Sequence, residues 1–505
     1  MFMNAMANTL NNEFNYARTE NGALGFRCYG KALLDLNFAV SSLRKANEND
    51  IVNRFIRAFH ENKVLAMKWL FFARDAREGL GERRLFRVIL SNLVNSNPEM
   101  VIPLINLISE YGRYDDMWCL LDNKESAKVV LELVDKQLTE DLKNMNAGKP
   151  ISLLAKWLPS ANCSSEQSKK YAKQIFKALG LTEREYRKAL SKFRKYLNVV
   201  EVKMSNKNWS EINYEAVPSR ANLIYNSAFL RNDGERRREY LGKLEKGEAK
   251  INASVLFPHD IVHKYSTGRW CSLGSKDAAI EAMWKALPDT VKGCGNTMVV
   301  ADGSGSMTVS VDPHSRLTAL EVANALAIYF AEHSSGEFKD KYITFSSRPQ
   351  LVDFSKCDSL HDKLQVAFKH NEVSNTNIEK VFDLILTTAV KNKMHQEDMP
   401  KNVLIISDME FDYATTGRPN ARLFETIAQR FESAGYKIPR LVFWNVNSRT
   451  GTIPVKENDL GVALVSGFSV NVAKMVLSGK LDPYECLLET LNSERYAPIE
   501  AALRN

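Results

Sequence analysis

Asp302, Ser304 and Ser306 form an Asp-x-Ser-x-Ser motif directly after the apolar run TMVVA. Alternate residues of a tight loop can point the same way, so one carboxylate and two hydroxyl oxygens can converge on one point. Gly303 and Gly305 let the backbone bend there without a Cβ clash. Because hard cations prefer oxygen ligands of this kind, the motif predicts a site for Mg²⁺ or another divalent cation such as Mn²⁺ or Ca²⁺.

Two residues further along the chain can complete this site. Thr376 precedes the segment NIEKVFDLIL, where a hydroxyl can both cap a helix and coordinate a metal. Asp408 follows the apolar run VLIIS, and a carboxylate buried at the end of a strand needs a partner, which a metal supplies. Glu410 and Asp412 either extend the acidic rim of this site or are exposed loop charges. The predicted metal ligands are Asp302, Ser304, Ser306, Thr376 and Asp408.

The chain from about residue 295 onward contains the elements that position these ligands. Short apolar runs predict strands, and longer segments with apolar residues three and four apart predict helices. The strands are predicted in TMVVA, KYITFSS, PQLVDF, NVLIISDME, RLVFWNV and GVALVSG, and the helices in RLTALEVANALAIYFAEHS, NIEKVFDLILTTAVKN and ARLFETIAQRFESAG. Strands alternating with helices predict a mostly parallel sheet covered on both faces. Ligands meet at the carboxyl ends of such strands, where Asp302 and Asp408 stand.

The order and spacing of Asp302-Gly-Ser304-Gly-Ser306-Met, Thr376 and Asp408 resemble the metal-ion-dependent adhesion site of von Willebrand factor A domains. The resemblance implies a Rossmann-like domain over residues 291–505. It also implies that the Ser and Thr hydroxyls bind the metal directly and that the two Asp residues bind it directly or through water. An acidic group of a partner then completes the shell. We find no base beside a nucleophile, so we expect a binding site with no catalytic residues and no enzyme activity.

Residues 26–290 show a helical pattern instead. Segments such as KALLDLNFAVSSLR, DIVNRFIRAFHEN and VLAMKWLFFARDAR carry apolar residues at helical spacing, and Gly and Pro residues separate such segments. Helices of this length with short connections predict an all-helical domain, either a HEAT-like solenoid or ring or a plain helical domain. Residues 1–25 are polar and rich in Asn, and they are predicted to form an irregular segment ahead of it.

The basic charge of the chain is concentrated in this helical part. Residues 1–290 hold 45 Lys and Arg against 34 Asp and Glu, whereas residues 291–505 hold 23 against 26. This asymmetry suggests a polyanionic partner. The densest stretch covers two consecutive predicted helices, and we predict that its basic residues bind RNA: Lys169, Lys170, Lys173, Lys177, Arg184, Arg187, Lys188, Lys192, Arg194 and Lys195.

Aromatic residues interleave with these cations and can stack on unpaired bases: Tyr171, Tyr186, Phe193 and Tyr196. The alternative is a solvated helix face whose aromatic residues belong to the core. A second basic cluster either binds a ligand or is satisfied by internal salt bridges: Arg74, Arg77, Arg83 and Arg84. In a third cluster, Arg236, Arg237 and Arg238 are consecutive and splay around a helix, which favours a solvated surface.

The helical part also resembles a known family. NGALGFRCYGKALLDL, ARDAREGLGERRLFRVIL and RYDDMW are similar to the TROVE module of Ro autoantigen proteins. In that family a ring of helical repeats, closed by the A domain, binds misfolded and small non-coding RNAs. The resemblance is closer to an uncharacterised bacterial, phage and plant family with the same two parts, on segments such as KWLPS and KGEAKINASVLFPHDIV. It implies a non-enzymatic ribonucleoprotein component. The alternative is a metal-dependent protein-interaction module with no nucleic-acid role.

Cysteine usage and hydropathy indicate the cellular compartment of the protein. The 7 cysteines are scattered and form no CxxC pair, which favours a reducing compartment over a disulfide framework or a zinc site. No apolar run reaches the length of a membrane span, and the N-terminus MFMNAMANTLNNEF lacks the regions of a signal peptide. We therefore expect a cytoplasmic protein, most simply a monomer, without a membrane partner.

Overall fold

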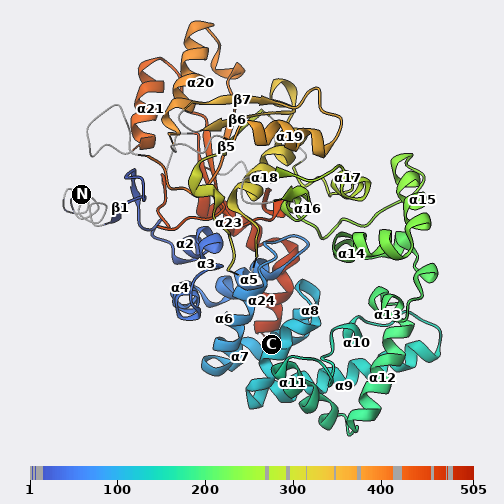
Figure 1. Cartoon of the computed structure of the whole chain (residues 1–505). Helices are drawn as coiled ribbons and strands as arrows, with labels where there is room; N and C mark the ends of the chain where they lie inside the picture. Colours follow the sequence, from blue (N-terminus) through green and yellow to red (C-terminus); the bar gives the residue numbers. More distant parts are fainter. Residues whose placement is uncertain are drawn as a thin grey trace. The chain divides into compact units, whose positions relative to one another are not determined.

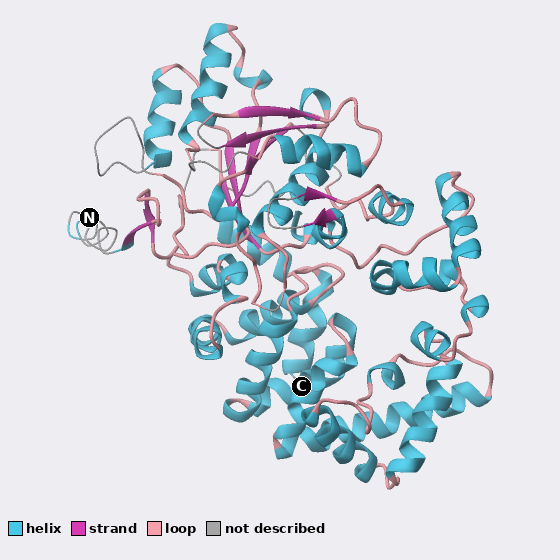
Figure 2. Ribbon diagram, in the orientation of Figure 1, coloured by secondary structure: helices cyan, strands magenta, loops and turns pink. Residues whose placement is uncertain are grey.

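The computed structural model describes residues 3, 6, 15–267, 272–291, 296–313, 315–345, 348–371, 377–412, 423–455, 460–473, 475 and 481–504. The chain divides into two compact units, each built from two separate stretches of sequence. The first unit comprises residues 1–62 and 256–492, and the second comprises residues 63–255 and 493–505. Helices predominate, and the larger sheet lies in the first unit (Figures 1 and 2).

Six strands of the first unit form a mixed sheet in the order β10-β9-β8-β5-β6-β7. The neighbours from β10 through to β6 pair in parallel, and only the edge pair β6 and β7 is antiparallel. The strands are β5 (Thr297–Asp302), β6 (Lys341–Phe345), β7 (Gln350–Asp353), β8 (Asn402–Ser407), β9 (Arg440–Asn445) and β10 (Val462–Ser466). Five of them fall within the runs that the sequence pattern predicts as strands, and β5 extends the run TMVVA by one residue, to Asp302. The prediction of a mostly parallel sheet is thus confirmed for the described residues.

Burial explains why these runs form central strands. Every residue of β9 and β10 is buried, and in β5 and β8 a single position of each strand is only half-buried. Strands covered on both faces read as continuous apolar runs, which is the pattern of TMVVA and NVLIIS. The helix α18 (Ala319–His333) packs against β5, β6 and β8, and its side chains from Ala319 to Ala331 are all buried.

The remaining elements of the first unit surround this sheet or extend from it. Its other helices are α2 (Ala32–Phe38), α3 (Val40–Leu43), α4 (Glu48–Glu61), α16 (Pro258–Tyr265), α17 (Ala278–Lys285), α19 (Leu360–Lys369), α20 (Glu379–Lys391), α21 (Leu423–Ser433) and α23 (Pro483–Leu491). Its short 3₁₀ turns are η5 (Gly305–Thr308), η6 (Gly336–Phe338), η7 (Gln396–Asp398) and η8 (Val470–Val472). Two small antiparallel pairs join β1 (Tyr16–Arg18) to β2 (Leu24–Phe26) and β3 (Ser266–Thr267) to β4 (Ser272–Leu273).

The described part of the second unit consists of helices and turns. Its α-helices are α5 (Lys63–Arg74), α6 (Arg83–Ser96), α7 (Pro98–Val101), α8 (Ile108–Tyr111), α9 (Lys124–Asn146), α10 (Leu154–Trp157), α11 (Glu166–Ala178), α12 (Glu183–Tyr196), α13 (Val200–Ser205), α14 (Ser219–Asn232), α15 (Gly234–Glu245) and α24 (Ala497–Arg504). Its 3₁₀ segments are η1 (Ile102–Leu107), η2 (Tyr114–Asp122), η3 (Trp209–Glu211), η4 (Tyr214–Ala216) and η9 (Glu494–Tyr496). The helical character agrees with the sequence pattern, whereas the HEAT-like solenoid or ring stays a prediction.

The two units divide the chain at different places from the predicted domains 1–25, 26–290 and 291–505. The N-terminal helix α2 packs against β10, and Asn445 of β9 donates its side-chain amide to the carbonyl oxygen of Phe38 over 2.9 Å. The helix α16 packs against α18, where Nδ1 of His263 lies 3.0 Å from Oε1 of Glu321. At the other end of the chain, α24 packs against α5, and Lys68 pairs with Glu500 over 2.6 Å. Such contacts between distant segments leave no local pattern in the sequence.

Among the described residues, no helix combines the length and the apolar character that crossing a membrane requires. Cys28, Cys119, Cys163, Cys357 and Cys486 are free thiols. Cys271 and Cys294 lie outside the described residues.

Candidate metal centre and nucleic-acid surface

The sheet brings Asp302 and Asp408 to the same edge. The strands β5 and β8 are parallel neighbours, with Ala301 opposite Ile406, so both strands end at the same level. Asp302 is the last residue of β5, and Asp408 directly follows β8. Both carboxylates are buried, with exposed fractions of 1% and 0%. The strand order therefore produces the convergence that the sequence pattern predicts.

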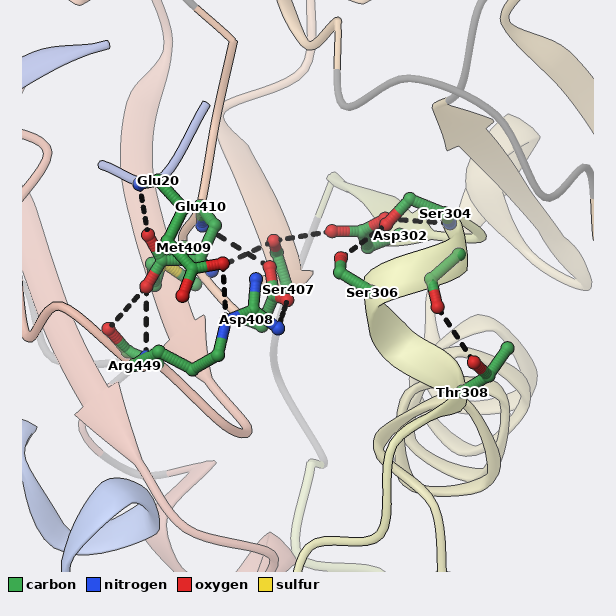
Figure 3. A network of polar contacts seen from close by, with 12 residues as sticks. Glu20, Asp302, Ser304, Ser306, Thr308, Ser407, Asp408, Met409, Glu410 and Arg449 are labelled. Carbon is green, nitrogen blue, oxygen red and sulfur yellow. Dashed lines mark hydrogen bonds and ion pairs between the residues drawn. The ribbon is translucent and has the colours of Figure 1, made fainter. Parts of the chain in front are cut away.

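The loop after β5 turns its polar groups towards this edge (Figure 3). The backbone N–H of Ser304 donates to Oδ1 of Asp302 over 2.9 Å, and the hydroxyls of Ser304 and Ser306 lie 2.9 Å apart. On the neighbouring strand, the Ser407 hydroxyl donates to Oδ2 of Asp302 over 2.6 Å. Three predicted ligands and Ser407 thus form one continuous polar network. Ser407 was not predicted, although its place at the end of β8 was visible in the sequence.

Burial and like charge leave the two carboxylates electrostatically unbalanced. Burial, followed by the neighbouring Asp408, raises the pKa of Asp302 to about 7. Burial also raises the pKa of Asp408, while Arg449 and the Ser306 hydroxyl act in the opposite direction. Oδ2 of Asp408 accepts no hydrogen bond within the described chain, and Nη1 of Arg449 lies 3.4 Å from it. Among the described residues, one guanidinium beside two buried carboxylates leaves a shortage of positive charge.

These residues fit a divalent cation. Asp302, Ser304, Ser306 and Asp408 offer hard oxygen donors, and one buried carboxylate oxygen lacks a hydrogen bond. Thr376, the fifth predicted ligand, lies outside the described residues. The described part of the chain contains no group of three or more His, Cys, Asp or Glu side chains that could hold a metal. A cation here would therefore depend on the serine hydroxyls as well as on the two aspartates.

Glu410 is neither an exposed loop charge nor an available ligand at the rim. Its side chain is buried, and Oε1 accepts hydrogen bonds from the backbone N–H groups of Arg449 and Thr450, each over 2.9 Å. Oε2 accepts a third from the N–H of Glu20 over 2.9 Å. These backbone donors compensate its charge, so Glu410 ties together three segments of the first unit. Asp412 pairs with Gly22 in an isolated β-bridge, at the margin of the same network.

The N-terminal segment contacts the loops that follow β8 and β9. The Thr19 hydroxyl donates to the carbonyl oxygen of Phe411 over 2.6 Å. Phe26 and Ile453 exchange backbone hydrogen bonds of 2.9 and 2.8 Å. Arg449 bridges this segment to the candidate metal centre, because its Nε lies 2.8 Å from Glu20 while Nη1 faces Asp408 (Figure 3). No local pattern predicts this contact, since Glu20 and Arg449 are far apart in the chain.

The predicted RNA-binding residues lie on α11 and α12 of the second unit. Most are exposed: Lys170, Lys173, Lys177, Arg184, Arg187, Lys188, Lys192 and Lys195. Within the described residues, Lys173, Lys177 and Arg187 form no ion pair, and the same holds for Lys192 and Lys195. Their helices bury an opposite, mainly apolar side that includes Ala172, Ile175, Tyr186, Leu190 and Phe193. We call the outer side of α11 and α12 the cationic face.

Three of the predicted RNA-binding residues have protein partners. Lys169 pairs with Glu166 over 2.7 Å, and Lys170 pairs with Asp122 over 2.6 Å. Arg194 is half-buried, and its guanidinium donates to the carbonyl oxygens of Ala155 and Leu158 over 2.9 and 2.7 Å. Arg194 therefore caps the short helix α10, a role that the count of basic residues could not distinguish from a surface charge.

The aromatic residues between these cations mostly belong to the core. Tyr186 and Phe193 are buried, which agrees with the alternative interpretation of a solvated helix face over an aromatic core. Tyr171 is half-buried and donates its hydroxyl to Asp122 over 2.7 Å. Only Tyr196 is exposed, at 39%. The cationic face thus offers phosphate contacts and, among these four aromatics, a single exposed ring.

Two family models match successive parts of the chain. A domain of unknown function, DUF2828, matches residues 127–297, and another, DUF7788, matches residues 296–496. The chain is also similar to uncharacterized protein L728 of Acanthamoeba polyphaga mimivirus, with 29% identity over 96% of this chain and 89% of that protein.

Among solved structures, the chain is similar to the Ro (RSR) protein of Deinococcus radiodurans. The identity is 14%, the match covers 88% of this chain and 93% of that chain, and the TM-score is 0.33. A likeness at this identity and TM-score does not establish a shared function.

The third basic cluster is a solvated surface only in part, because Arg238 is exposed and Arg236 half-buried, whereas Arg237 faces inward. Arg237 is fully buried, and its guanidinium donates to the side-chain oxygens of Asn222 and Asn226. It also lies 4.9 Å from the ring centroid of Tyr214. Arg236 pairs with Asp233 over 2.8 Å. The prediction was wrong for Arg237, because one residue of any consecutive triplet on a helix can face inward.

Proposed function

We propose that this protein is a non-enzymatic RNA-binding protein that contacts RNA through the cationic face of α11 and α12. The observation that carries the proposal is the set of exposed cations that lack an ion pair within the described residues: Lys173, Lys177, Arg187, Lys192 and Lys195. A cation without a carboxylate neighbour keeps its charge for a phosphate, and the release of counterions from the nucleic acid drives binding.

The proposed target is RNA recognised by its backbone. Phosphate contacts position a nucleic acid without reading its sequence, whereas reading unpaired bases requires exposed rings and hydrogen-bonding groups. The burial of Tyr186 and Phe193 leaves Tyr196 as the exposed aromatic of the four considered. Small non-coding or misfolded RNAs with single-stranded ends fit this mode, because they differ in sequence but share an accessible backbone.

The test is a titration of fluorescently labelled single-stranded RNA with the full-length protein, followed by anisotropy at about 50 mM salt. The double variant Lys173→Glu/Arg187→Glu should weaken binding by about tenfold or more. It should also flatten the dependence of log K on log salt, by roughly 0.7 for each lost phosphate contact on a single strand.

The matched control is Lys246→Glu, which reverses an exposed charge of the same unit outside the cationic face. It should leave RNA affinity within about twofold of the wild-type value, since a distant exposed charge is largely screened. A wild-type protein that ignores RNA at this salt would end the proposal. Equal losses in the control and the double variant would remove the cationic face from it.

We further propose that the first unit holds a divalent cation, with Mg²⁺ as the first choice, on Asp302, Ser304, Ser306 and Asp408. Thr376 remains the fifth predicted ligand. The shortage of positive charge around the buried aspartates supports this assignment. When bound, the cation supplies a compact positive charge and a coordination position open to an acidic group. The chain's own part is to hold the carboxylates and hydroxyls together and to exclude water around them.

This centre supports a second candidate function, a metal-dependent protein-interaction module without a nucleic-acid role. Its specific support is a site in which buried carboxylates and hydroxyls meet with no neighbouring general base among the described residues. A protein partner that supplies a Glu or Asp to the metal should bind in Mg²⁺ and dissociate in EDTA. The same complex should be lost in Asp302→Ala. A complex that survives both changes would refute this candidate.

A further inference from the structure

A second cluster of charged side chains lies in the second unit, on α5, α6 and η2. It comprises Arg74 at the end of α5, Arg83 and Arg87 on α6, Arg113 at the start of η2, and the consecutive residues Asp115 and Asp116. We call these six residues the arginine cluster. The sequence left open whether Arg74 and Arg83 bind a ligand or form internal salt bridges. The structure shows that both take part in internal ion pairs.

Asp116 is the buried centre of the cluster. Nε of Arg74 donates to its Oδ2 and Nε of Arg87 to its Oδ1, each over 2.7 Å. The backbone N–H of Arg113 donates to Oδ2 over 3.0 Å. Burial alone would raise the pKa of Asp116, but Arg74 and Arg87 hold it below its usual value. Asp116 thus fixes two guanidinium groups and one backbone amide in place.

The three outer arginines are partly exposed to solvent. Arg83, Arg87 and Arg113 are 43%, 31% and 31% exposed. Arg83 pairs with Asp115 through Nη2, and Nε of Arg113 lies 3.2 Å from the same carboxylate. Nη2 of Arg87 lies 3.1 Å from it. Within the described chain, Nη1 of Arg83 and Arg87 and both terminal nitrogens of Arg113 have no hydrogen-bond partner.

The ring of Trp157 packs against the guanidinium group of Arg113. The guanidinium carbon of Arg113 lies 4.2 Å from the centroid of that ring. A guanidinium stacked on an aromatic face loses little conformational freedom when it binds an anion. The outer arginines are therefore held in place before any ligand arrives, which lowers the entropic cost of binding.

The cluster carries more positive than negative charge. Four guanidinium groups, those of Arg74, Arg83, Arg87 and Arg113, surround the carboxylates of Asp115 and Asp116. Burial lowers the pKa of Arg83, and the neighbouring Arg87 lowers it further. Burial also lowers the pKa of Arg113, and Arg83 is among the charges that add to this effect. A purely structural network would need fewer cations, because Arg74 and Arg87 already satisfy the buried Asp116.

We propose that the outer arginines Arg83, Arg87 and Arg113 form a binding site for a phosphoryl group. A phosphate dianion matches the surplus charge, and its oxygens match the planar fork of N–H donors that a guanidinium presents. The phosphoryl group can belong to a free phosphorylated small molecule or to a nucleic acid. The proposal goes beyond RNA binding at α11 and α12, and it stands or falls independently of that surface.

The experiment is isothermal titration calorimetry of the full-length protein with inorganic phosphate at low salt. Arg83→Gln should weaken phosphate binding by about tenfold, because it removes one charged donor. Asp116 keeps Arg74 and Arg87 in this variant, so the fold should be retained. Asp115→Asn should have the opposite effect and strengthen binding severalfold, because it removes the carboxylate that competes for the same donors.

The matched control is Arg77→Gln, because Arg77 is an exposed arginine that pairs with Glu110 outside the cluster. It should leave the dissociation constant for phosphate unchanged. Circular dichroism of every variant verifies the fold. No heat with the wild-type protein at about 10 mM phosphate would overturn the proposal. Weaker binding in Asp115→Asn would also overturn it, since the aspartate would then support the site and not oppose the ligand.

A second titration distinguishes the two sources of the phosphoryl group. It uses a short single-stranded RNA without terminal phosphates, so that only backbone phosphates are present. If Arg83→Gln weakens this RNA as much as inorganic phosphate, the site takes a nucleic-acid backbone. If only inorganic phosphate is affected, the site takes a free phosphoryl group. Failure of RNA binding at Lys173 and Arg187 alone would leave the phosphate result untouched, so the two proposals fail separately.

Discussion

The candidate metal centre of the first unit and the arginine cluster of the second unit have opposite charge balances. At the sheet edge, two buried carboxylates, Asp302 and Asp408, face a single guanidinium among the described residues, that of Arg449. In the arginine cluster, Arg74, Arg83, Arg87 and Arg113 surround the carboxylates of Asp115 and Asp116. The surplus of negative charge at the sheet edge favours a cation as the ligand. The surplus of positive charge in the arginine cluster favours an anion.

The comparison also separates structural charges from charges that await a ligand. Asp116 is buried but accepts from Arg74, Arg87 and a backbone amide, so its charge is compensated. Asp302 is equally buried, but its partners among the described residues are the neutral donors Ser304 N–H and the Ser407 hydroxyl. Burial is thus common to both aspartates, and the identity of their partners distinguishes them.

Asp116→Ala should have the largest effect on stability. It leaves the buried Arg74 without its carboxylate, and an uncompensated buried charge costs about 3–5 kcal/mol of unfolding free energy. Urea unfolding followed by circular dichroism measures the loss. Asp115→Ala serves as the control. Asp115 is partly exposed and pairs with arginines that are themselves partly exposed, so its loss leaves no fully buried cation without a carboxylate. If both variants lose less than about 1 kcal/mol, Asp116 is not the structural centre of the cluster.

Ser407→Ala should weaken the metal centre while preserving the fold. The Ser407 hydroxyl orients Asp302 over 2.6 Å, and loss of a partner that orients a ligand costs about 10–100-fold in metal affinity. Titration with Mn²⁺ measures the change. Ser433→Ala, which removes a hydroxyl bonded only to the carbonyl oxygen of Gln429 on an exposed helix face, should leave the affinity unchanged. Equal affinities of Ser407→Ala and the wild type would show that Asp302 needs no such positioning.

Asp302→Asn should stabilise the metal-free protein, in contrast to Asp116→Ala. In EDTA the substitution removes one of two neighbouring buried carboxylates, so the unfolding free energy should rise by about 1 kcal/mol at neutral pH. In Mg²⁺ the sign should reverse, because the wild type gains the binding energy of the cation and the variant does not. Thermal unfolding in both conditions checks this crossing. A variant that is less stable than the wild type in EDTA would contradict the charge argument.

Asp122→Asn should give the smallest effect, a slight strengthening of RNA binding. Asp122 accepts from Lys170 over 2.6 Å and from Tyr171 over 2.7 Å at the border of the cationic face. Its removal frees Lys170 for a phosphate, and an exposed pair of this kind is worth at most about 1 kcal/mol. Anisotropy should show an affinity increase of about two- to threefold. A decrease in RNA affinity would mean that the pairing of Lys170 with Asp122 is needed to hold the cationic face in its RNA-binding conformation.

The sheet and the meeting of Asp302 and Asp408 at its edge were largely predictable. The continuous apolar runs before Asp302 and Asp408 have a single reasonable interpretation as buried strands, and parallel strands end at a common edge. The Gly and Ser residues directly after Asp302 then mark the loop that follows the first of these strands. The local pattern was sufficient here because each ligand lies within a few residues of the strand that positions it.

The surroundings of that edge were not predictable from the same pattern. Glu410 looked like a rim charge, but backbone amides from two other segments, at Glu20 and Arg449, compensate it. Arg194 and Arg237 looked like surface cations, but carbonyl and amide oxygens of distant residues hold them. Residue type and spacing report the local helix or strand, whereas these partners depend on contacts between segments far apart in the chain.

The most direct test of the central claim is a titration of the wild-type protein, Asp302→Ala and Asp408→Ala with Mn²⁺, followed by electron paramagnetic resonance. Mn²⁺ is the probe because its free and bound forms give different signals. We predict one bound Mn²⁺ per chain in the wild type, displaced by excess Mg²⁺ and lost in both variants. Binding that persists in both variants, or a wild-type protein that leaves all Mn²⁺ free, would show that the unbalanced carboxylates at the sheet edge do not form a metal centre.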